Sequence, residues 1–349
     1  MRIMGNILSY SGLSTKIRAM QSRLLTTQQY RELAELKNVP QAVAWLKQKP
    51  AYENTWASLS DDELHRGKIE QLLVNSIYND FTKIYRFANI HQRKFLDLYF
   101  GRYELSIMKE CLNKIFDHRD VQLDLSVFEP FFNKHSRLDI HKLTASGSIE
   151  EFVANLKGTP YYQILQSLAN LEKPTLFDYE MALDLYYFST IWRTKDKILS
   201  KKDLEEITAA YGNKFDLLNL QWIYRSKQYY HVNTANIYAL LIPVNYRLSK
   251  KDITALVESE STSAFETALA QTYYGKHYER LSPNTLEEMY SYIMKHVLSK
   301  ESKQDPYSVA TIYCYLYHKE HEIDRLTTVL ECIRYGVDPD DTMNYIFKS

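Results

Sequence analysis

The sequence predicts an all-α protein made of three similar helical domains, and three observations support this prediction. Glycine and proline, which interrupt helices, are scarce: there are nine of each in 349 residues, about 5% together against roughly 12% in average usage. Apolar residues return every three or four positions along most of the chain, and no segment alternates strictly for long enough to predict a strand. A pattern of residues also recurs after about 110 positions. These features argue against a β-sandwich, a collagen-like chain and a disordered linker protein.

The helical periodicity can be followed from the N-terminal region onward. Apolar returns at three or four residues occur at Tyr30, Leu33, Leu46, Ile69, Leu72, Leu73 and Ile77. Further along, Leu105, Met108 and Leu112 form one stripe at helical spacing. We therefore expect amphipathic helices, each burying one apolar face.

The recurring pattern is clearest between Val39–Tyr52 and Ser148–Tyr162. A shift of about 110 residues aligns identical residues of the two segments: Leu46 with Leu156, Lys47 with Lys157, Pro50 with Pro160 and Tyr52 with Tyr162. A further shift of similar length gives a weaker third copy, in which Phe265 and Leu269 continue the pattern.

This repeat predicts helical domains at residues 1–131, 132–244 and 245–349. Each unit is long enough to be a small domain, unlike the shorter units of ordinary solenoids. Three similar domains joined head to tail favour a pseudo-threefold, funnel-like arrangement.

Capping residues explain why a short helix forms in the repeated segment. Ser148 and Glu151 have the spacing of a capping box in the second copy, and Asn38 is a favoured N-cap residue in the first. In the third copy we expect the cap at Ser263 with Glu266, two residues out of register. That displacement indicates that the third copy has diverged.

A second recurring element lies in the later part of each predicted domain. Its copies are RYELSIMKECL, KFDLLNLQWIY and EHEIDRLTTVL, and each places an acid, Glu104, Asp216 or Glu322, directly before an apolar stripe. We expect these acids to lie in first helical turns, where the helix dipole favours a negative charge by ~0.3–1 kcal/mol. The sequence leaves open whether this structural role suffices or the acids also act directly in function.

Charge and cysteine content exclude several classes of protein. Lysine and arginine total 43 and so do aspartate and glutamate, so the basic excess typical of a nucleic-acid-binding protein is missing. Cys111, Cys314 and Cys332 are too few for a secreted disulfide framework. The N-terminal segment lacks the apolar core of a signal peptide, and the apolar run Tyr238–Val244 is far shorter than a membrane span. We expect a cytoplasmic protein that meets a membrane only through another protein.

The sequence offers no motif for catalysis, cofactor binding or a metal site. The glycines do not have the spacing of a Walker A loop or a Rossmann fingerprint. His318 and His321 share a predicted helix face but lack a third ligand, so we interpret them as part of a solvated face near a turn. Cys111 and Cys332 occupy apolar stretches, where burial is the expected state. The 29 tyrosines could pack between helices or contact a partner protein, and both interpretations remain open.

Two longer stretches carry a resemblance to a known family. They are YSGLSTKIRAMQSRLLT, with Tyr10, Arg18–Met20 and the leucine pair Leu24 and Leu25, and EIDRLTTVLECIRYGVDPDD. In the second stretch the matching residues are Glu322, Ile323, Leu326, Arg334, Tyr335 and Gly336. In order and spacing the chain resembles the C-subunit family of the V-type (A/V-type) ATPases and ATP synthases, which includes the d subunit of the eukaryotic V-type ATPase. The resemblance covers essentially the whole chain.

The resemblance implies a mechanical function. In that family three helical domains form a funnel that sits on the membrane rotor ring and receives the central shaft. The implied protein is a non-catalytic central-stalk subunit, without a cofactor, that couples ATP turnover to proton or sodium transport. It would be present once per complex and would associate with the membrane peripherally, through its partner subunits. The alternative is a general all-helical repeat scaffold or adaptor.

The same resemblance suggests where partners would be contacted. In a pseudo-threefold funnel the corresponding helix starts of the three domains would meet around one opening. On that basis the acids and their basic neighbours are candidates for the interface with the shaft or the ring: Arg102, Glu104, Lys214, Asp216, Lys319 and Glu322.

Overall fold

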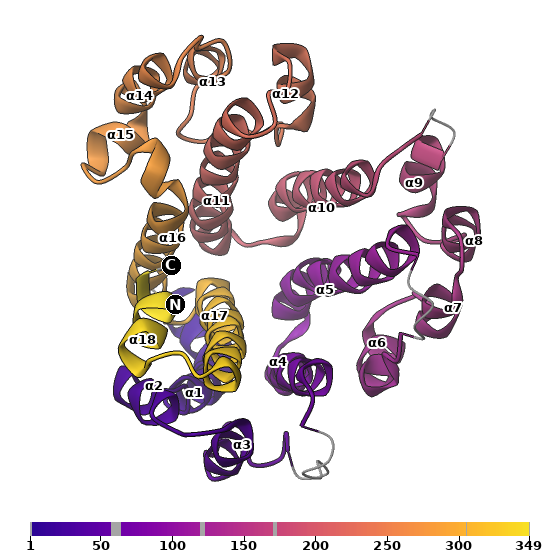
Figure 1. The fold of residues 1–349 in the computed structure, drawn as a ribbon. Coiled ribbons are helices and arrows are strands. Elements are labelled where there is room, and N and C mark those ends of the chain that lie inside the picture. Colours follow the sequence, from indigo (N-terminus) through magenta and orange to yellow (C-terminus); the bar gives the residue numbers. More distant parts are fainter. Residues whose placement is uncertain (1, 57–63, 119–122, 170–172, 305, 349) are drawn as a thin grey trace. The chain divides into compact units, whose positions relative to one another are not determined.

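The computed structural model describes residues 2–56, 64–118, 123–169, 173–304 and 306–348 (Figure 1). Within these ranges every regular element is a helix, which confirms the all-α prediction. None of the helices in this part of the chain combines the length and apolarity needed to cross a bilayer.

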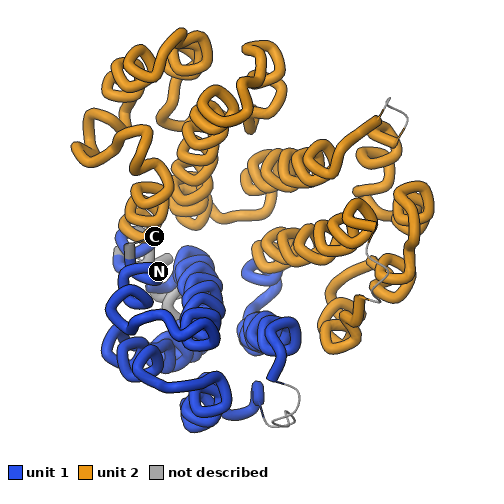
Figure 2. Tube along the Cα trace, viewed as in Figure 1, with its two compact units in different colours: residues 1–93, 298–349 blue, residues 94–297 orange. Residues whose placement is uncertain are grey.

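The chain forms two compact units (Figure 2). Unit 1 combines the two ends of the sequence, residues 1–93 and 298–349, whereas unit 2 is the continuous stretch 94–297. The division into three domains of similar size stays a prediction.

Unit 1 is built around a long helix near the C-terminus. Its helices are α1 (Arg2–Gln21), α2 (Thr27–Ala34), α3 (Val39–Lys47), α4 (Arg66–Phe87), α17 (Val309–Tyr335) and α18 (Pro339–Lys348). Helix α17 packs against α1, α2, α3 and α4, and its first residues, from Val309 to Tyr317, are all buried. A helix from the C-terminal part of the chain thus forms the centre of unit 1, and helices from the N-terminal part pack around it.

Unit 2 contains long helices flanked by groups of short ones. The long helices are α10 (Leu176–Ile198), α11 (Lys201–Gln228) and the larger parts of α5 (Ile90–Phe116) and α16 (Leu286–Gln304). The short ones are η2 (Ser126–Phe128), α6 (Glu129–His135), α7 (Ile140–Ala145), α8 (Ile149–Asn155), α9 (Tyr162–Ala169), α12 (Thr234–Leu240), α13 (Lys250–Val257), α14 (Thr262–Gln271), α15 (Tyr273–His277) and η3 (Pro283–Thr285).

Aromatic and polar contacts join the long helices of unit 2. The Lys109 ammonium of α5 lies 2.7 Å from the Asp184 carboxylate of α10. The rings of Phe188 on α10 and Phe215 on α11 have centroids 5.1 Å apart. Tilted aromatic pairs of this kind add to the stabilisation that apolar burial provides.

The apolar positions that the repeat aligns belong to the core. Leu46, Leu156 and Leu269 are buried, and so are Leu33, Leu143 and Leu256. The stripes that follow the three acids are buried as well. Cys111 and Cys332 are buried thiols, as predicted.

The N-cap predictions were right for two copies and wrong for the third, and the capping box expected in the second copy is incomplete, because the Glu151 carboxylate accepts a hydrogen bond from the Gly147 amide instead of the Ser148 amide. Asn38 and Ser148 are the N-caps of α3 and α8. The N-cap of α14 is Ser261, whose hydroxyl accepts a hydrogen bond from the Ala264 amide at 3.1 Å, and Ser263 lies inside the helix. An N-cap needs extended backbone, and Ser261 has it, with φ −143° and ψ 162°.

The tyrosines divide between core and surface. In each of the pairs 161/162, 186/187 and 273/274 one ring is buried and the other is half-buried, whereas Tyr229 and Tyr230 are both exposed. Burial therefore depends on the individual position: packing between helices is confirmed for the buried rings, and contact of the exposed ones with a partner stays a prediction.

Candidate functional site

The three predicted acids lie in the middle of long helices, so the expectation of first-turn positions was wrong. Glu104 belongs to α5, Asp216 to α11 and Glu322 to α17. The residues before each acid continue the helix, and the dipole effect is confined to the terminal turn. Asp216 is 0% exposed and Glu322 is 3% exposed, whereas Glu104 is half-buried. Buried carboxylates need hydrogen-bond donors, and each of these has them.

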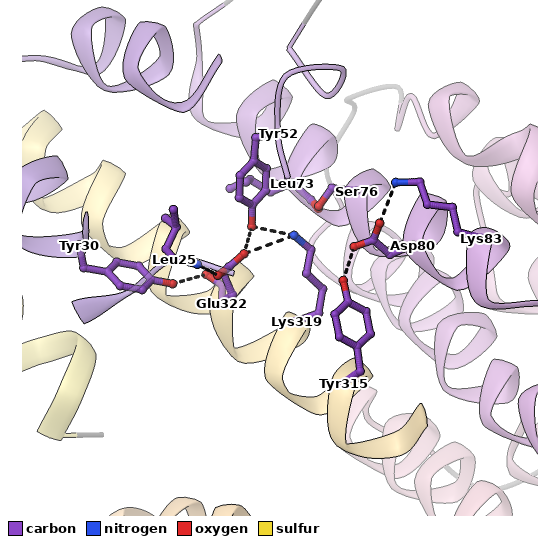
Figure 3. A network of polar contacts seen from close by, with 10 residues as sticks. All are labelled: Leu25, Tyr30, Tyr52, Leu73, Ser76, Asp80, Lys83, Tyr315, Lys319 and Glu322. Atoms are coloured by element: carbon purple, nitrogen blue, oxygen red, sulfur yellow. Dashed lines mark hydrogen bonds and ion pairs between the residues drawn. The ribbon is translucent and has the colours of Figure 1, made fainter. Parts of the chain in front are cut away.

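Glu322 connects the two ends of the chain (Figure 3). One of its carboxylate oxygens accepts a hydrogen bond from the Leu25 amide at 2.6 Å, and the other accepts one from the Tyr52 hydroxyl. The Lys319 ammonium donates to the Tyr52 hydroxyl oxygen at 2.8 Å and lies 3.4 Å from the Glu322 carboxylate. Figure 3 also shows Tyr30, whose hydroxyl donates to the Glu322 carbonyl oxygen at 3.4 Å.

Asp216 binds a turn and a tyrosine within unit 2. Its carboxylate accepts hydrogen bonds from the amides of Arg247 at 2.6 Å, Leu248 at 3.0 Å and Tyr246 at 3.3 Å. The Tyr274 hydroxyl lies 3.1 Å from the same carboxylate and 3.0 Å from the Asn213 side-chain oxygen. The acid thus holds together two segments that flank helices α13 and α14.

Glu104 makes the corresponding contacts with the first short helices of unit 2. Its carboxylate accepts hydrogen bonds from the Tyr161 hydroxyl at 2.6 Å and from the Ser136 hydroxyl. The Ser136 hydroxyl oxygen in turn accepts one from the Leu138 amide at 2.9 Å. Here a serine side chain links the acid to the backbone.

We call each of these arrangements a clamp, named after its acid. In each clamp an acid on a long helix accepts a hydrogen bond from a tyrosine that follows a pair of short helices in the sequence. The same acid also holds, directly or through a serine, the residue just before that pair. The residues before the pair are Leu25, Leu138 and Leu248, and each directly precedes an N-cap: Thr26, Asp139 and Ser249. The clamped pairs are α2–α3, α7–α8 and α13–α14. Each acid therefore fastens both ends of a helix pair to one long helix.

Burial sets the electrostatics of the clamps. It raises the pKa of Asp216 to about 6, although hydrogen bonds from the amides of the turn and from Tyr274 act in the opposite direction. Burial likewise raises the pKa of Glu104, against the hydroxyls of Ser136 and Tyr161. Burial and the neighbouring carboxylate raise the pKa of each clamp tyrosine well above its usual value. The tyrosines therefore stay protonated and donate.

The residue three positions before each acid makes the clamps chemically different. This position is Gly101 in the Glu104 clamp, Asn213 in the Asp216 clamp and Lys319 in the Glu322 clamp. It faces the tyrosine hydroxyl each time: a Cβ at Gly101 would lie 3.9 Å from the Tyr161 oxygen. Lys319 is 0% exposed, and it also lies 4.1 Å from the centroid of the Tyr52 ring.

The other two predicted basic residues, Arg102 and Lys214, directly follow Gly101 and Asn213 in the sequence. The Arg102 guanidinium donates to the Tyr99 hydroxyl at 2.8 Å. The Lys214 ammonium lies over the rings of Phe188 and Tyr211, at 5.8 and 5.9 Å from their centroids. Both side chains are half-buried. The contact of Arg102 is a charge-assisted hydrogen bond, and those of Lys214 are cation–π contacts.

Sequence reasoning identified the acids but missed their partners. The alignment paired Tyr52 with Tyr162, whereas the tyrosine that binds Glu104 is Tyr161. The leucine before each N-cap was a usable signal, since it recurs in all three copies. The interpretation of His318 and His321 as part of a solvated face near a turn was also wrong. Both lie in the middle of α17 and are half-buried, and Lys319 and Glu322 beside them are buried.

Comparison with known proteins agrees with the resemblance noted in the sequence. The family model described as ATP synthase (C/AC39) subunit matches residues 13–345. The A-type ATP synthase C subunit of Pyrococcus abyssi is 26% identical over 342 residues, covering 95% of this chain and 88% of its own. The protein of the same name from Thermococcus kodakarensis is 23% identical and covers 99% of this chain and 92% of its own. The protein of that name from Methanosphaera stadtmanae is 22% identical and covers 92% of this chain and 83% of its own. Because the family model spans nearly the whole sequence, the chain belongs to the ATP synthase (C/AC39) subunit family.

Proposed function

We propose that this protein is a non-catalytic central-stalk subunit of an A/V-type rotary ATPase or ATP synthase. It would act as a socket between the central shaft and the membrane rotor ring, and so couple ATP turnover to proton or sodium transport. The observation that carries the proposal is the match to the ATP synthase C/AC39 family over residues 13–345. Relatives that cover almost the same length are named as C subunits of A-type ATP synthases.

The clamps support a mechanical role. A subunit that transmits torque has to keep its helices in fixed positions under load. Each clamp joins a pair of short helices to a long helix through hydrogen bonds to a carboxylate, which are stronger than those between neutral groups. A force applied to a short helix pair is therefore passed to the long helix instead of bending the connecting turns.

We propose that the six predicted interface residues take part in partner binding in two ways. Asp216, Lys319 and Glu322 are buried and would act from inside, by holding the short helix pairs that face partners. Arg102, Glu104 and Lys214 are half-buried, and their accessible atoms can meet a partner directly. The partners would be the shaft subunits and the proteolipid ring, with one copy of this chain per complex in the cytoplasm. A funnel of three similar helical domains is the arrangement that we propose for this role.

Removal and restoration of the protein tests this function. The complex is purified from detergent extract with and without this chain, reconstituted in vesicles, and assayed for ATP hydrolysis and for ATP-driven ion uptake. We expect the head and ring subunits to co-purify with the tagged chain, and ion uptake to fail without it while hydrolysis continues. Adding the recombinant chain back should restore uptake. Ion uptake that persists without the chain, or purification with neither head nor ring subunits, would contradict the proposal and favour the adaptor interpretation.

The role of the clamps in coupling is tested by mild substitutions. Tyr161→Phe and Tyr274→Phe remove one hydroxyl each and keep the ring, so the complex should still assemble. We expect a lower ratio of ions transported to ATP hydrolysed, because the short helix pairs are held less firmly. Tyr230→Phe, at an exposed tyrosine, is the matched control and should leave the ratio unchanged if the loss arises inside the clamps.

A further inference from the structure

The Glu322 clamp differs from the other two in how the chain closes it. Glu104 and Tyr161 are 57 residues apart in sequence, and Asp216 and Tyr274 are 58 apart. In both cases the chain runs directly from the acid to its tyrosine. Tyr52 and Glu322 are 270 residues apart, and unit 2 lies between them in the sequence. The first two clamps close within one stretch of chain, whereas the third joins the two ends.

Closing a longer loop is less favourable. With a loop-closure probability that falls as the power −3/2 of loop length, a loop of 270 residues closes about tenfold less readily than one of 57. The contacts of the Glu322 clamp offset only part of this difference. Its acid accepts one backbone hydrogen bond, from the Leu25 amide, whereas Asp216 accepts three, and Lys319 adds a buried cation at the place that Gly101 and Asn213 occupy in the other clamps.

Buried charge makes this contact less costly to open than an apolar contact of the same size. Lys319 and Glu322 lose their hydration when α17 is covered, and their attraction has to make up for it. When the N-terminal helices leave α17, both groups regain water. The ion pairs Arg31–Asp340 and Arg66–Glu331 also join the ends, but the side chains of Arg31, Asp340 and Arg66 are exposed, so these pairs add little. Residues 1–93 and 298–349 are thus held together by the apolar packing of α17 against α1, α2, α3 and α4, and the polar contacts of the Glu322 clamp add to this packing.

We propose that the boundary between residues 1–93 and α17 is the closure joint of the fold, with Lys319 as its positioning residue. It is the place where the native protein opens first. Opening detaches the pair α2–α3 from α17 and leaves the other two clamps closed.

Native-state hydrogen exchange of the full-length chain, read by mass spectrometry, tests the proposal. The three clamped pairs serve as matched reporters: α2–α3, α7–α8 and α13–α14. After correction for intrinsic rates, the amides of α2–α3 should exchange at least tenfold faster than those of the other two pairs. Exchange of α2–α3 that is as slow as that of both other pairs overturns the proposal.

Single substitutions distinguish local opening at the closure joint from a general loss of stability. Tyr52→Phe removes one hydroxyl from the Glu322 clamp, and Tyr274→Phe is the matched change in the Asp216 clamp. We expect Tyr52→Phe to speed exchange of α2–α3 at least tenfold and leave α7–α8 and α13–α14 unchanged. Tyr274→Phe should affect α13–α14 alone. Lys319→Met keeps the length of the side chain and should act like Tyr52→Phe. Faster amide exchange in all three helix pairs after Tyr52→Phe would show that α2–α3 does not open separately from the rest of the protein.

Discussion

Replacing Asp216 by Asn should remove a pH dependence from the stability of unit 2. The Asp216 carboxyl group is completely buried, and burial raises its pKa from 3.8 to about 6. Asparagine has nearly the same shape and keeps one oxygen that can accept hydrogen bonds from the turn at residues 246–248. Because asparagine does not titrate, a comparison of the two proteins isolates the contribution of this one group.

The magnitude follows from the pKa difference between the folded and unfolded states. A difference of about 2 units, at 1.36 kcal/mol per unit, corresponds to about 3 kcal/mol. The folded-state pKa is raised, so the folded protein binds a proton more tightly than the unfolded chain does. The contribution of Asp216 to stability is therefore fully present below pH ~4 and is lost as the pH rises through about 6.

Urea unfolding from pH 4 to 7.5, followed by tryptophan fluorescence, measures this difference. Trp192 and Trp222 lie on α10 and α11 of unit 2 and report on it. The free energy of unfolding of the wild-type protein minus that of Asp216→Asn should fall by about 2 kcal/mol over this pH range, because part of the unfolded-state carboxyl is already ionised at pH 4. A difference that stays constant, or that rises with pH, would contradict this prediction. It would mean that the three amides and the Tyr274 hydroxyl balance or outweigh the loss of hydration.

Further substitutions test the same part of the structure and one helix cap. Tyr274→Phe removes a donor that lowers the pKa of Asp216, so the pH dependence of unfolding should move to higher pH in the same urea experiment. Gly212→Ala would place a Cβ against the ring of Tyr246, closer than van der Waals contact allows, and should destabilise the protein by about 1–3 kcal/mol, measured by thermal unfolding. Gly12→Ala, where a Cβ meets nothing within 4 Å, is the control and should not destabilise. Ser261→Ala should cost about 1 kcal/mol of stability, whereas Ser263→Ala, inside the helix, should cost almost nothing.

Features that depend on neighbouring residues were predictable from the sequence. The apolar positions shared by the repeated segments, such as Leu46 and Leu156, are buried because a short amphipathic helix has one face that must be covered. Spacing also sufficed to place the N-caps at Asn38 and Ser148. The family resemblance was correct because it combined several weak motifs in a fixed order along the whole chain.

Features that depend on distant residues were not predictable in this way. An acid before an apolar stripe has the same appearance at a helix start and in the middle of a long helix, so the positions of Glu104, Asp216 and Glu322 were misjudged. Nothing near Glu322 in the sequence indicates that its partners are Leu25 and Tyr52. Such pairings are set by tertiary packing, which places a buried carboxylate where donors from another segment can reach it.

The split Glu322 clamp has a consequence for synthesis on the ribosome. Tyr52 emerges 270 residues before its acid, and at a rate of roughly 5–20 residues per second this delay lasts about 15–50 s. During that time unit 2 can finish folding, whereas the nascent helices α2 and α3 lack the surface that covers their apolar side chains. Completion of the N-terminal helices therefore has to wait for release of the last part of the polypeptide.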